Sequence, residues 1–224
     1  MAERARPAAV VFDCDGVLAN TEEAAWHAWT VALADQDQPA LTAMDIAALT
    51  GPTKAENLVY LGATRRPIDL DRLLADFEGH LRRVVETRLG AYPDTVAAVS
   101  ALAASGVPMA VASNSPAAWV ELVIASTDTP PVFRAIVAIE DVDRPKPAPD
   151  LYAEAVRQLG VSGVMTVAVE DSPTGIAAAR AAGLAVLGVR RGYFDDDELA
   201  AAHLLVDEVD VTAIEIALAK AVEG

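Results

Sequence analysis

Short runs of β-branched and other apolar residues alternate with alanine-rich stretches along most of the chain. The apolar runs predict strands at residues 8–13, 107–113, 135–139, 164–170 and 185–189, with a weaker strand at 204–206. The stretches at residues 94–105, 116–126, 149–159 and 173–182 predict helices. Because the first five strand runs are almost entirely apolar, both faces of each strand should be covered. The pattern therefore predicts an α/β fold with a doubly wound, Rossmann-like parallel sheet.

Local signals at the ends of these helices agree with the pattern. Ser115 and Ser172 each precede a proline, which places a capping hydroxyl before a residue suited to the first helical position. Gly106, Gly160 and Gly183 stand where three of the helices should stop.

One region, residues 21–89, contains no strand run. Trp26, Trp29 and Leu33 recur there at helical spacing, and apolar residues between positions 70 and 85 do so again. We therefore predict an all-helical domain of residues 21–89 inserted into an α/β core of residues 1–20 and 90–224. The alternative is that these helices simply pack on the sheet.

Composition limits the classes of partner. The chain has 224 residues, with 17 Lys and Arg against 33 Asp and Glu, and a formal net charge of −16. Such a charge disfavours binding to nucleic acid or to a membrane surface, since both require clustered basic residues. Although 53% of the residues are hydrophobic, no stretch approaches the roughly 20 apolar residues of a membrane span. A single cysteine and the absence of a secretory signal pattern lead us to expect a cytoplasmic protein.

Two carboxylates follow the first predicted strand, in Asp13-Cys14-Asp15-Gly16. Alternate residues of an extended chain point the same way, so Asp13 and Asp15 can face one crevice at the carboxyl edge of the sheet. Close carboxylates stay ionised together only beside a cation, unless one takes a proton. A divalent metal, with one carboxylate as nucleophile and the other as acid and base, meets both needs. A solvated turn is the alternative.

A second acidic pair, Glu170 and Asp171, follows the fourth predicted strand and should lie at the same edge. Four acids without a Cys or His cluster suggest a hard cation with oxygen ligands, above all Mg²⁺. The alternative is that the pair only favours the amino end of the next helix through its dipole.

Polar groups also follow the second and third predicted strands. Ser113 and Asn114 come before a helix start and could form an anion site, although helix capping is the simpler explanation. Lys146 lies between Pro145 and Pro147, which fix the backbone and so aim the ammonium group. An ordinary exposed lysine is the alternative.

These motifs, in this order and at these strand ends, resemble the haloacid dehalogenase-like hydrolase superfamily. The resemblance rests on residues 13–18, Ser113-Asn114, residues 146–150 and residues 170–176. The helical insertion after the first motif resembles, in position and type, the small cap of the subgroup that contains β-phosphoglucomutase and sugar-phosphate phosphatases.

The resemblance implies a role for each motif residue. Asp13 would be the nucleophile that forms an aspartyl-phosphate, and Asp15 would protonate the leaving oxygen and then activate water. Ser113, Asn114 and Lys146 would bind the phosphoryl group. Mg²⁺ would be held by four acidic residues, Asp13, Asp15, Glu170 and Asp171, and Asp15 would contact it through its main-chain carbonyl.

The resemblance further implies a phosphatase acting on a small phosphorylated metabolite, either as a monomer or as a weak homo-oligomer. An acid at Asp15 favours phosphate esters over the carbon substrates of the dehalogenases. Mutases of the β-phosphoglucomutase type carry a cap histidine where this chain has Ala25, so we expect hydrolysis. A phosphosugar mutase and a non-catalytic phospho-ligand binding protein remain the alternatives. Thr53 and Lys54 of the cap would read the substrate, or else would simply be solvated at the start of a helix.

Overall fold

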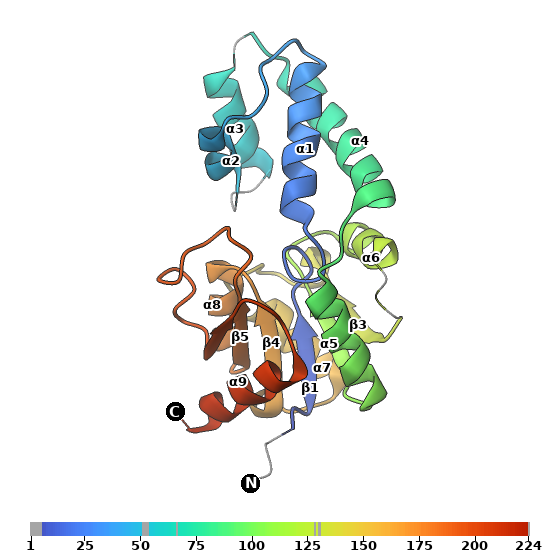
Figure 1. Cartoon of the computed structure of the whole chain (residues 1–224), viewed down its shortest axis with the longest axis vertical. Helices are drawn as coiled ribbons and strands as arrows, with labels where there is room; N and C mark the ends of the chain where they lie inside the picture. Colours follow the sequence, from blue (N-terminus) through green and yellow to red (C-terminus); the bar gives the residue numbers. More distant parts are fainter. Residues whose placement is uncertain (1–5, 51–53, 66, 128, 130, 224) are drawn as a thin grey trace. The chain divides into compact units, whose positions relative to one another are not determined.

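A computed structural model describes residues 6–50, 54–65, 67–127, 129 and 131–223. The chain divides into two compact units, Met1–Ala19 with Gly90–Gly224 and Asn20–Leu89. The first unit contains a sheet, and the second is the helical stretch that interrupts it in sequence (Figure 1).

The first unit contains a sheet of six parallel strands in the order β3-β2-β1-β4-β5-β6. The strands are β1 (Ala9–Phe12), β2 (Met109–Ala112), β3 (Phe133–Val137), β4 (Thr166–Glu170), β5 (Ala185–Val189) and β6 (Leu204–Val206). The chain runs outward from β1 to β3, then returns to β4 on the other side of β1. This reversal makes the carboxyl edge between β1 and β4 a topological switch point, where doubly wound folds bind their ligands. The predicted α/β fold is confirmed.

Helices cover both faces of this sheet. They are α5 (Pro93–Ala104), α6 (Ala117–Ser126), α7 (Asp150–Leu159), α8 (Pro173–Ala181) and α9 (Val211–Glu223), with short 3-10 turns η1 (Ile139–Asp141) and η2 (Gly163–Met165). On one face, α7 and α8 pack against strand residues Val11, Ala110 and Ala168 in a fully buried core. On the other face, α9 packs against β5 and contacts α5 (Figure 1). Both faces of the central strands are therefore shielded from solvent, which accounts for their apolar sequences.

The second unit contains four helices among its described residues. They are α1 (Thr21–Ala34), α2 (Ala43–Leu49), α3 (Lys54–Thr64) and α4 (Leu70–Arg88). Trp29 of α1 stacks on Phe77 of α4, with ring centroids 3.7 Å apart, and leucines of α1, α3 and α4 complete a separate core.

A buried polar node also ties this unit together. Asp45, which is only 3% exposed, closes a capping box with Thr42 at the start of α2. The same carboxylate accepts hydrogen bonds from Tyr60 at 2.9 Å and Arg65 at 2.8 Å. Burial alone would raise the pKa of Asp45, but the hydrogen bonds from Thr42, Arg65 and Tyr60 outweigh it and hold that pKa well below its usual range.

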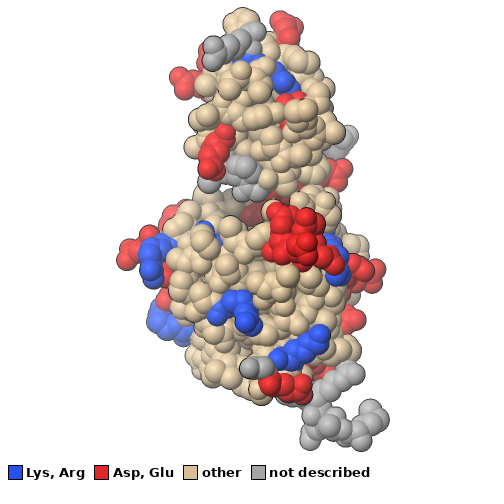
Figure 2. Space-filling view, turned by 90° about the vertical axis from the view of Figure 1, so that its left-hand side faces the viewer, with Lys and Arg blue, Asp and Glu red and all other residues tan. Residues whose placement is uncertain are grey.

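Charged side chains lie scattered over the surface drawn in Figure 2, and the basic ones on that face do not form a continuous stripe. Within the described part of the chain, no helix combines the length and the apolar character needed to cross a membrane.

Candidate active site

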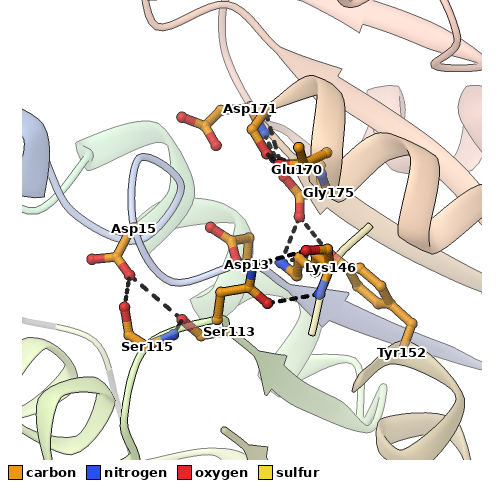
Figure 3. A network of polar contacts seen from close by, with 12 residues as sticks. Asp13, Asp15, Ser113, Ser115, Lys146, Tyr152, Glu170, Asp171 and Gly175 are labelled. Carbon is orange, nitrogen blue, oxygen red and sulfur yellow. Dashed lines mark hydrogen bonds and ion pairs between the residues drawn. The ribbon is translucent and has the colours of Figure 1, made fainter. Parts of the chain in front are cut away.

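The motif residues of the first unit come together because parallel strands deliver their carboxyl ends to one edge. Asp13 directly follows β1, Ser113 follows β2, and Glu170 is the last residue of β4. Lys146 comes from the loop between η1 and α7. Figure 3 shows Asp13, Lys146 and Glu170 in one network. The sequence pattern placed Asp13, Ser113 and Glu170 after or at the ends of strands, and the order β2-β1-β4 makes those strand ends neighbours.

Lys146 is the centre of this network, and its side chain is only 4% exposed. Its Nζ donates to Asp13 Oδ1 at 2.5 Å and to Glu170 Oε1 at 2.6 Å. The ammonium also lies 4.9 Å from the centre of the Tyr152 ring. Burial by itself would lower the pKa of Lys146, but the two carboxylates outweigh burial and hold it above its usual value. The lysine is therefore a fixed positive charge beside Asp13.

Glu170 is fully buried, and both of its carboxylate oxygens accept hydrogen bonds from the protein. Oε1 accepts from Lys146 and, at 2.7 Å, from the Tyr152 hydroxyl. Oε2 accepts from the backbone N–H groups of Asp171 and Ser172 and from the Ser172 hydroxyl. The side chain predicted as a metal ligand thus also anchors the lysine. A bound metal would have to share one of these oxygens.

Three carboxylates gather closely enough to hold one cation. Ligand oxygens of Asp13, Glu170 and Asp171 all lie within 4.8 Å of one another. Burial raises the pKa of Asp13 to about 8, opposed by Lys146 and reinforced by the negative charges of Glu170 and Asp15. A cation beside Asp13 would relieve both the burial cost and the repulsion.

The backbone next to this cluster is shaped for the carboxylates. Gly16 has φ +79°, and a Cβ built there would lie 1.9 Å from Asp171 Oδ2. A Cβ at Gly175 would lie 1.7 Å from Glu170 Oε1. Both glycines therefore leave room for an acidic side chain, and an all-oxygen donor set of this kind fits Mg²⁺.

Asp15 belongs to a separate set of contacts. Its Oδ2 accepts from the Ser115 hydroxyl at 2.7 Å and from the Ser113 hydroxyl at 3.4 Å, while Oδ1 accepts from Trp119 Nε1 at 2.9 Å. In Figure 3 the Asp15 carboxylate faces the two serines, whereas Asp13 faces Lys146. The Asp15 side chain is not among the described carboxylates that share the cation cluster. The expectation that its main-chain carbonyl meets a metal stays a prediction.

The expected capping role of Ser115 is wrong. Helix α6 begins at Ala117 after Pro116, which forms no side-chain capping hydrogen bond, and the backbone N–H of Ala117 donates to Glu140 instead. The Ser115 hydroxyl donates to Asp15 because the carboxylate lies within its reach. The parallel expectation for Ser172 is confirmed, since its side chain accepts from Gly175 N at 3.1 Å.

Asn114 supports the lysine loop through the backbone. Its Oδ1 accepts from Lys146 N at 2.8 Å, and its Nδ2 donates to Lys146 O at 3.3 Å. The amide therefore fixes the residue that carries the ammonium, while Ser113, which is fully buried, receives a hydrogen bond from Ser115 N at 3.0 Å.

The structure gives less support to the two cap residues that were predicted to contact a substrate, Thr53 and Lys54. Thr53 lies outside the described residues. Lys54, at the start of α3, forms an ion pair with Glu78 at 3.0 Å, and the lysine side chain is 57% exposed. This pairing is compatible with the simpler interpretation of a solvated lysine.

Two contributors, Trp119 and Tyr152, were missed from sequence. Trp119 stands one turn after the Ser113–Ser115 motif, and Tyr152 stands in the first turn of α7 after the lysine loop. Both are aromatic residues with one polar atom, which usually finds a partner when the ring is buried. That signal could have marked them as neighbours of the site.

Comparisons with known proteins agree with this geometry. The family described as haloacid dehalogenase-like hydrolase matches residues 10–189. A phosphoglycolate phosphatase of Cupriavidus necator is 31% identical over 90% of this chain and 90% of the relative. The fructose-1-phosphate phosphatase of Escherichia coli is 31% identical over 83% of this chain and 97% of the relative.

A solved structure shows that the whole fold is similar to that of a related protein. CbbY from Rhodobacter sphaeroides, in complex with phosphate, superposes with a TM-score of 0.78 at 25% identity, covering 93% of this chain and 99% of the other. Motifs, strand order and family match together show that the chain belongs to the haloacid dehalogenase-like hydrolases.

Proposed function

We propose that the chain is a Mg²⁺-dependent phosphatase that hydrolyses a small phosphorylated metabolite, a sugar phosphate or similar phosphomonoester, through an aspartyl-phosphate on Asp13. The observation that carries the proposal is the buried contact of Asp13 with Lys146 beside two further carboxylates at the switch point. Related phosphatases act on phosphoglycolate and fructose 1-phosphate, which are small phosphomonoesters. The expected compartment is the cytoplasm, in line with a single cysteine that is free and buried.

Asp13 would start the reaction by attacking phosphorus through a carboxylate oxygen. A new O–P bond forms as the bond to the leaving oxygen breaks. Lys146, together with Ser113, would bind phosphoryl oxygens and balance their charge. Lys146 is well placed for this because its position is already fixed by Glu170 and by the Asn114 contacts to its backbone.

Asp15 would act as acid and then as base. Its proton goes to the leaving oxygen in the first step, and it removes a proton from water in the second. The water oxygen then attacks phosphorus, phosphate leaves, and Asp13 is restored. The hydrogen bonds from Ser115 and Trp119 hold Asp15 for both steps.

Mg²⁺ would be held by Asp13 and Asp171, with Glu170 and the main-chain carbonyl of Asp15 completing the site. When bound, it would supply positive charge that neutralises the phosphoryl oxygens and keeps Asp13 ionised. Without a cation, the raised pKa of Asp13 opposes the anionic form that attack requires.

The test is a panel of phosphomonoesters, including sugar phosphates, phosphoglycolate and nucleotide monophosphates, assayed for phosphate release with Mg²⁺ or with a chelator. The expected result is metal-dependent release from at least one substrate, lost in Asp13→Asn and retained in Asp197→Asn. Asp197 is a suitable matched control because it is exposed on the same unit. Absence of metal-dependent release from every substrate would contradict the proposal.

The two alternatives give different results in the same assay. A phosphosugar mutase would isomerise a hexose phosphate without stoichiometric phosphate release; we favour hydrolysis because Ala25 of α1 cannot serve as the cap histidine. A non-catalytic binding protein would bind phospho-ligands and show no turnover, with or without Asp13→Asn.

A further inference from the structure

Trp119 lies in the first turn of α6, beside the proposed acid and base. Its Nε1 donates to Asp15 Oδ1 at 2.9 Å, and its backbone N–H donates to Pro116 O at 2.9 Å, which fixes it at the helix start. Among the described residues, the other oxygen of Asp15, Oδ2, has only hydroxyl partners, Ser115 at 2.7 Å and Ser113 at 3.4 Å. Each carboxylate oxygen therefore has partners of a different kind.

This difference separates what the two oxygens can do. An indole N–H can only donate, so Oδ1 must accept whether or not the carboxyl group carries a proton. A hydroxyl can donate to a carboxylate or accept from a carboxylic acid. The contacts of Oδ2 thus suit both protonation states, whereas the contact of Oδ1 favours an unprotonated oxygen, because the hydroxyl oxygen of a carboxylic acid is a weaker acceptor than its carbonyl oxygen. The partners of Asp15 therefore favour Oδ2 as the oxygen that carries the proton.

The indole also restricts how the side chain can move. Asp15 lies beyond the end of β1, in the turn in which Gly16 N donates to Ala19 O at 3.0 Å, and its carboxylate would otherwise rotate freely about its side-chain bonds. Trp119 on one oxygen and Ser115 on the other, both from the α6 side, fix that rotation. A displacement of about 1 Å of a reacting group can cost on the order of 10²-fold in rate.

We propose that Trp119 is a positioning residue that, by holding Oδ1 while Ser115 holds Oδ2, fixes the orientation of the Asp15 carboxylate for its action on the leaving oxygen. The inference rests on the proposed function, in which Asp15 protonates that oxygen as the P–O bond breaks and the Asp13 O–P bond forms. Trp119 touches neither substrate nor metal in this role; it acts through Asp15.

The leaving group provides the test. An alkyl phosphate, such as the best sugar phosphate of the panel, needs a proton on its leaving oxygen, whereas p-nitrophenyl phosphate releases a stable phenolate without one. Because kcat/KM reports the steps up to the first P–O cleavage, it isolates the acid role of Asp15. Trp119→Phe keeps an aromatic ring and removes the N–H donor.

We expect Trp119→Phe to lower kcat/KM for the alkyl phosphate about tenfold. The same substitution should lower kcat/KM for p-nitrophenyl phosphate less than about twofold. Trp119→His, which keeps a ring N–H, should recover part of the loss. Asp15→Asn should show the same selectivity more strongly. Ser126→Ala is the matched control, since it removes one side-chain hydrogen bond from the far end of α6 and should leave both values unchanged. Urea unfolding of each variant verifies that it is folded.

An equal loss for both substrates in Trp119→Phe would show a general structural role and overturn the proposal. No loss for either substrate would overturn it as well. If the unaltered protein hydrolyses neither substrate, the proposed function itself fails, and the inference fails with it. Activity of the unaltered protein on both substrates therefore separates the two failures.

Discussion

Removal of the charge of Asp13 should stabilise the metal-free protein while it abolishes turnover. Asp13 is 8% exposed and shares its surroundings with two other acids and one lysine. Burial and repulsion raise its pKa from 3.8 to about 8. Between these values the folded chain retains a proton that the unfolded chain has released. Its free energy of unfolding therefore falls as the pH rises from about 4 to about 8.

The magnitude follows from the width of that interval. One pKa unit corresponds to about 1.4 kcal/mol, so the difference between 3.8 and about 8 limits the destabilisation by ionised Asp13 to about 6 kcal/mol above pH 8. The attraction of Lys146 is already contained in that pKa, and local relaxation around an ionised Asp13 lowers the cost of its charge further. We expect the variant to be more stable by about 2 kcal/mol at pH 8, and by less than about 0.5 kcal/mol at pH 4.5.

The assay is urea unfolding of Asp13→Asn and the unaltered protein, with a chelator present, at pH 4.5, 6, 7 and 8. Added Mg²⁺ should stabilise the unaltered protein more than the variant, because a ligand stabilises the folded state that binds it best. Asp197→Asn should show no gap that widens with pH. A variant that is less stable at pH 8, or a gap that does not widen with pH, would refute the reasoning.

Three further substitutions probe the contacts described above. Lys146→Met should lower kcat at least about 100-fold, and urea unfolding should show a loss of about 3 kcal/mol, because Asp13 and Glu170 lose their shared cation. A kcat within tenfold of that of the unaltered protein would contradict this expectation. Gly175→Ala should cost about 2 kcal/mol and lower activity, since its Cβ would displace Glu170, whereas the open Gly79→Ala should be neutral or stabilising. Asp45→Ala should cost about 3 kcal/mol by leaving Arg65 unpaired. Because hydrogen bonds lower the pKa of Asp45, that difference should be full at neutral pH and should shrink progressively as the pH falls below about 4, where the carboxyl group takes up a proton in the unfolded chain first. Circular dichroism during unfolding can follow this change.

Hydrophobic patterning was sufficient to predict most of the fold. The strand runs are apolar because both faces of the sheet are covered, and the predicted strand at 185–189 matches β5. Patterning was less reliable at the ends of the strands and helices. The run at 164–170 includes the turn η2 before β4 begins at Thr166. Helix α9 was not predicted, because its alternating apolar residues do not separate a helix from a strand.

The site was predictable as far as strand ends could place it. Spacing brought Asp13, Glu170 and Asp171 to one edge, but it did not show that Glu170 points toward Lys146 and Tyr152. It also could not show that the Ser115 hydroxyl donates to Asp15 instead of capping α6, because that contact depends on a carboxylate 100 residues away in sequence. Contacts of this kind are set by the packing of strands and helices.

The central claim is that Asp13 carries the phosphoryl group, and acid-quench labelling tests it most directly. The protein would be mixed with a ³²P-labelled substrate from the panel and Mg²⁺, quenched within milliseconds, digested and analysed by mass spectrometry. The account predicts label on the peptide that contains Asp13, its loss in Asp13→Asn, and its retention in Asp197→Asn. Phosphate release without label on that peptide, or label that persists in Asp13→Asn, would contradict the account.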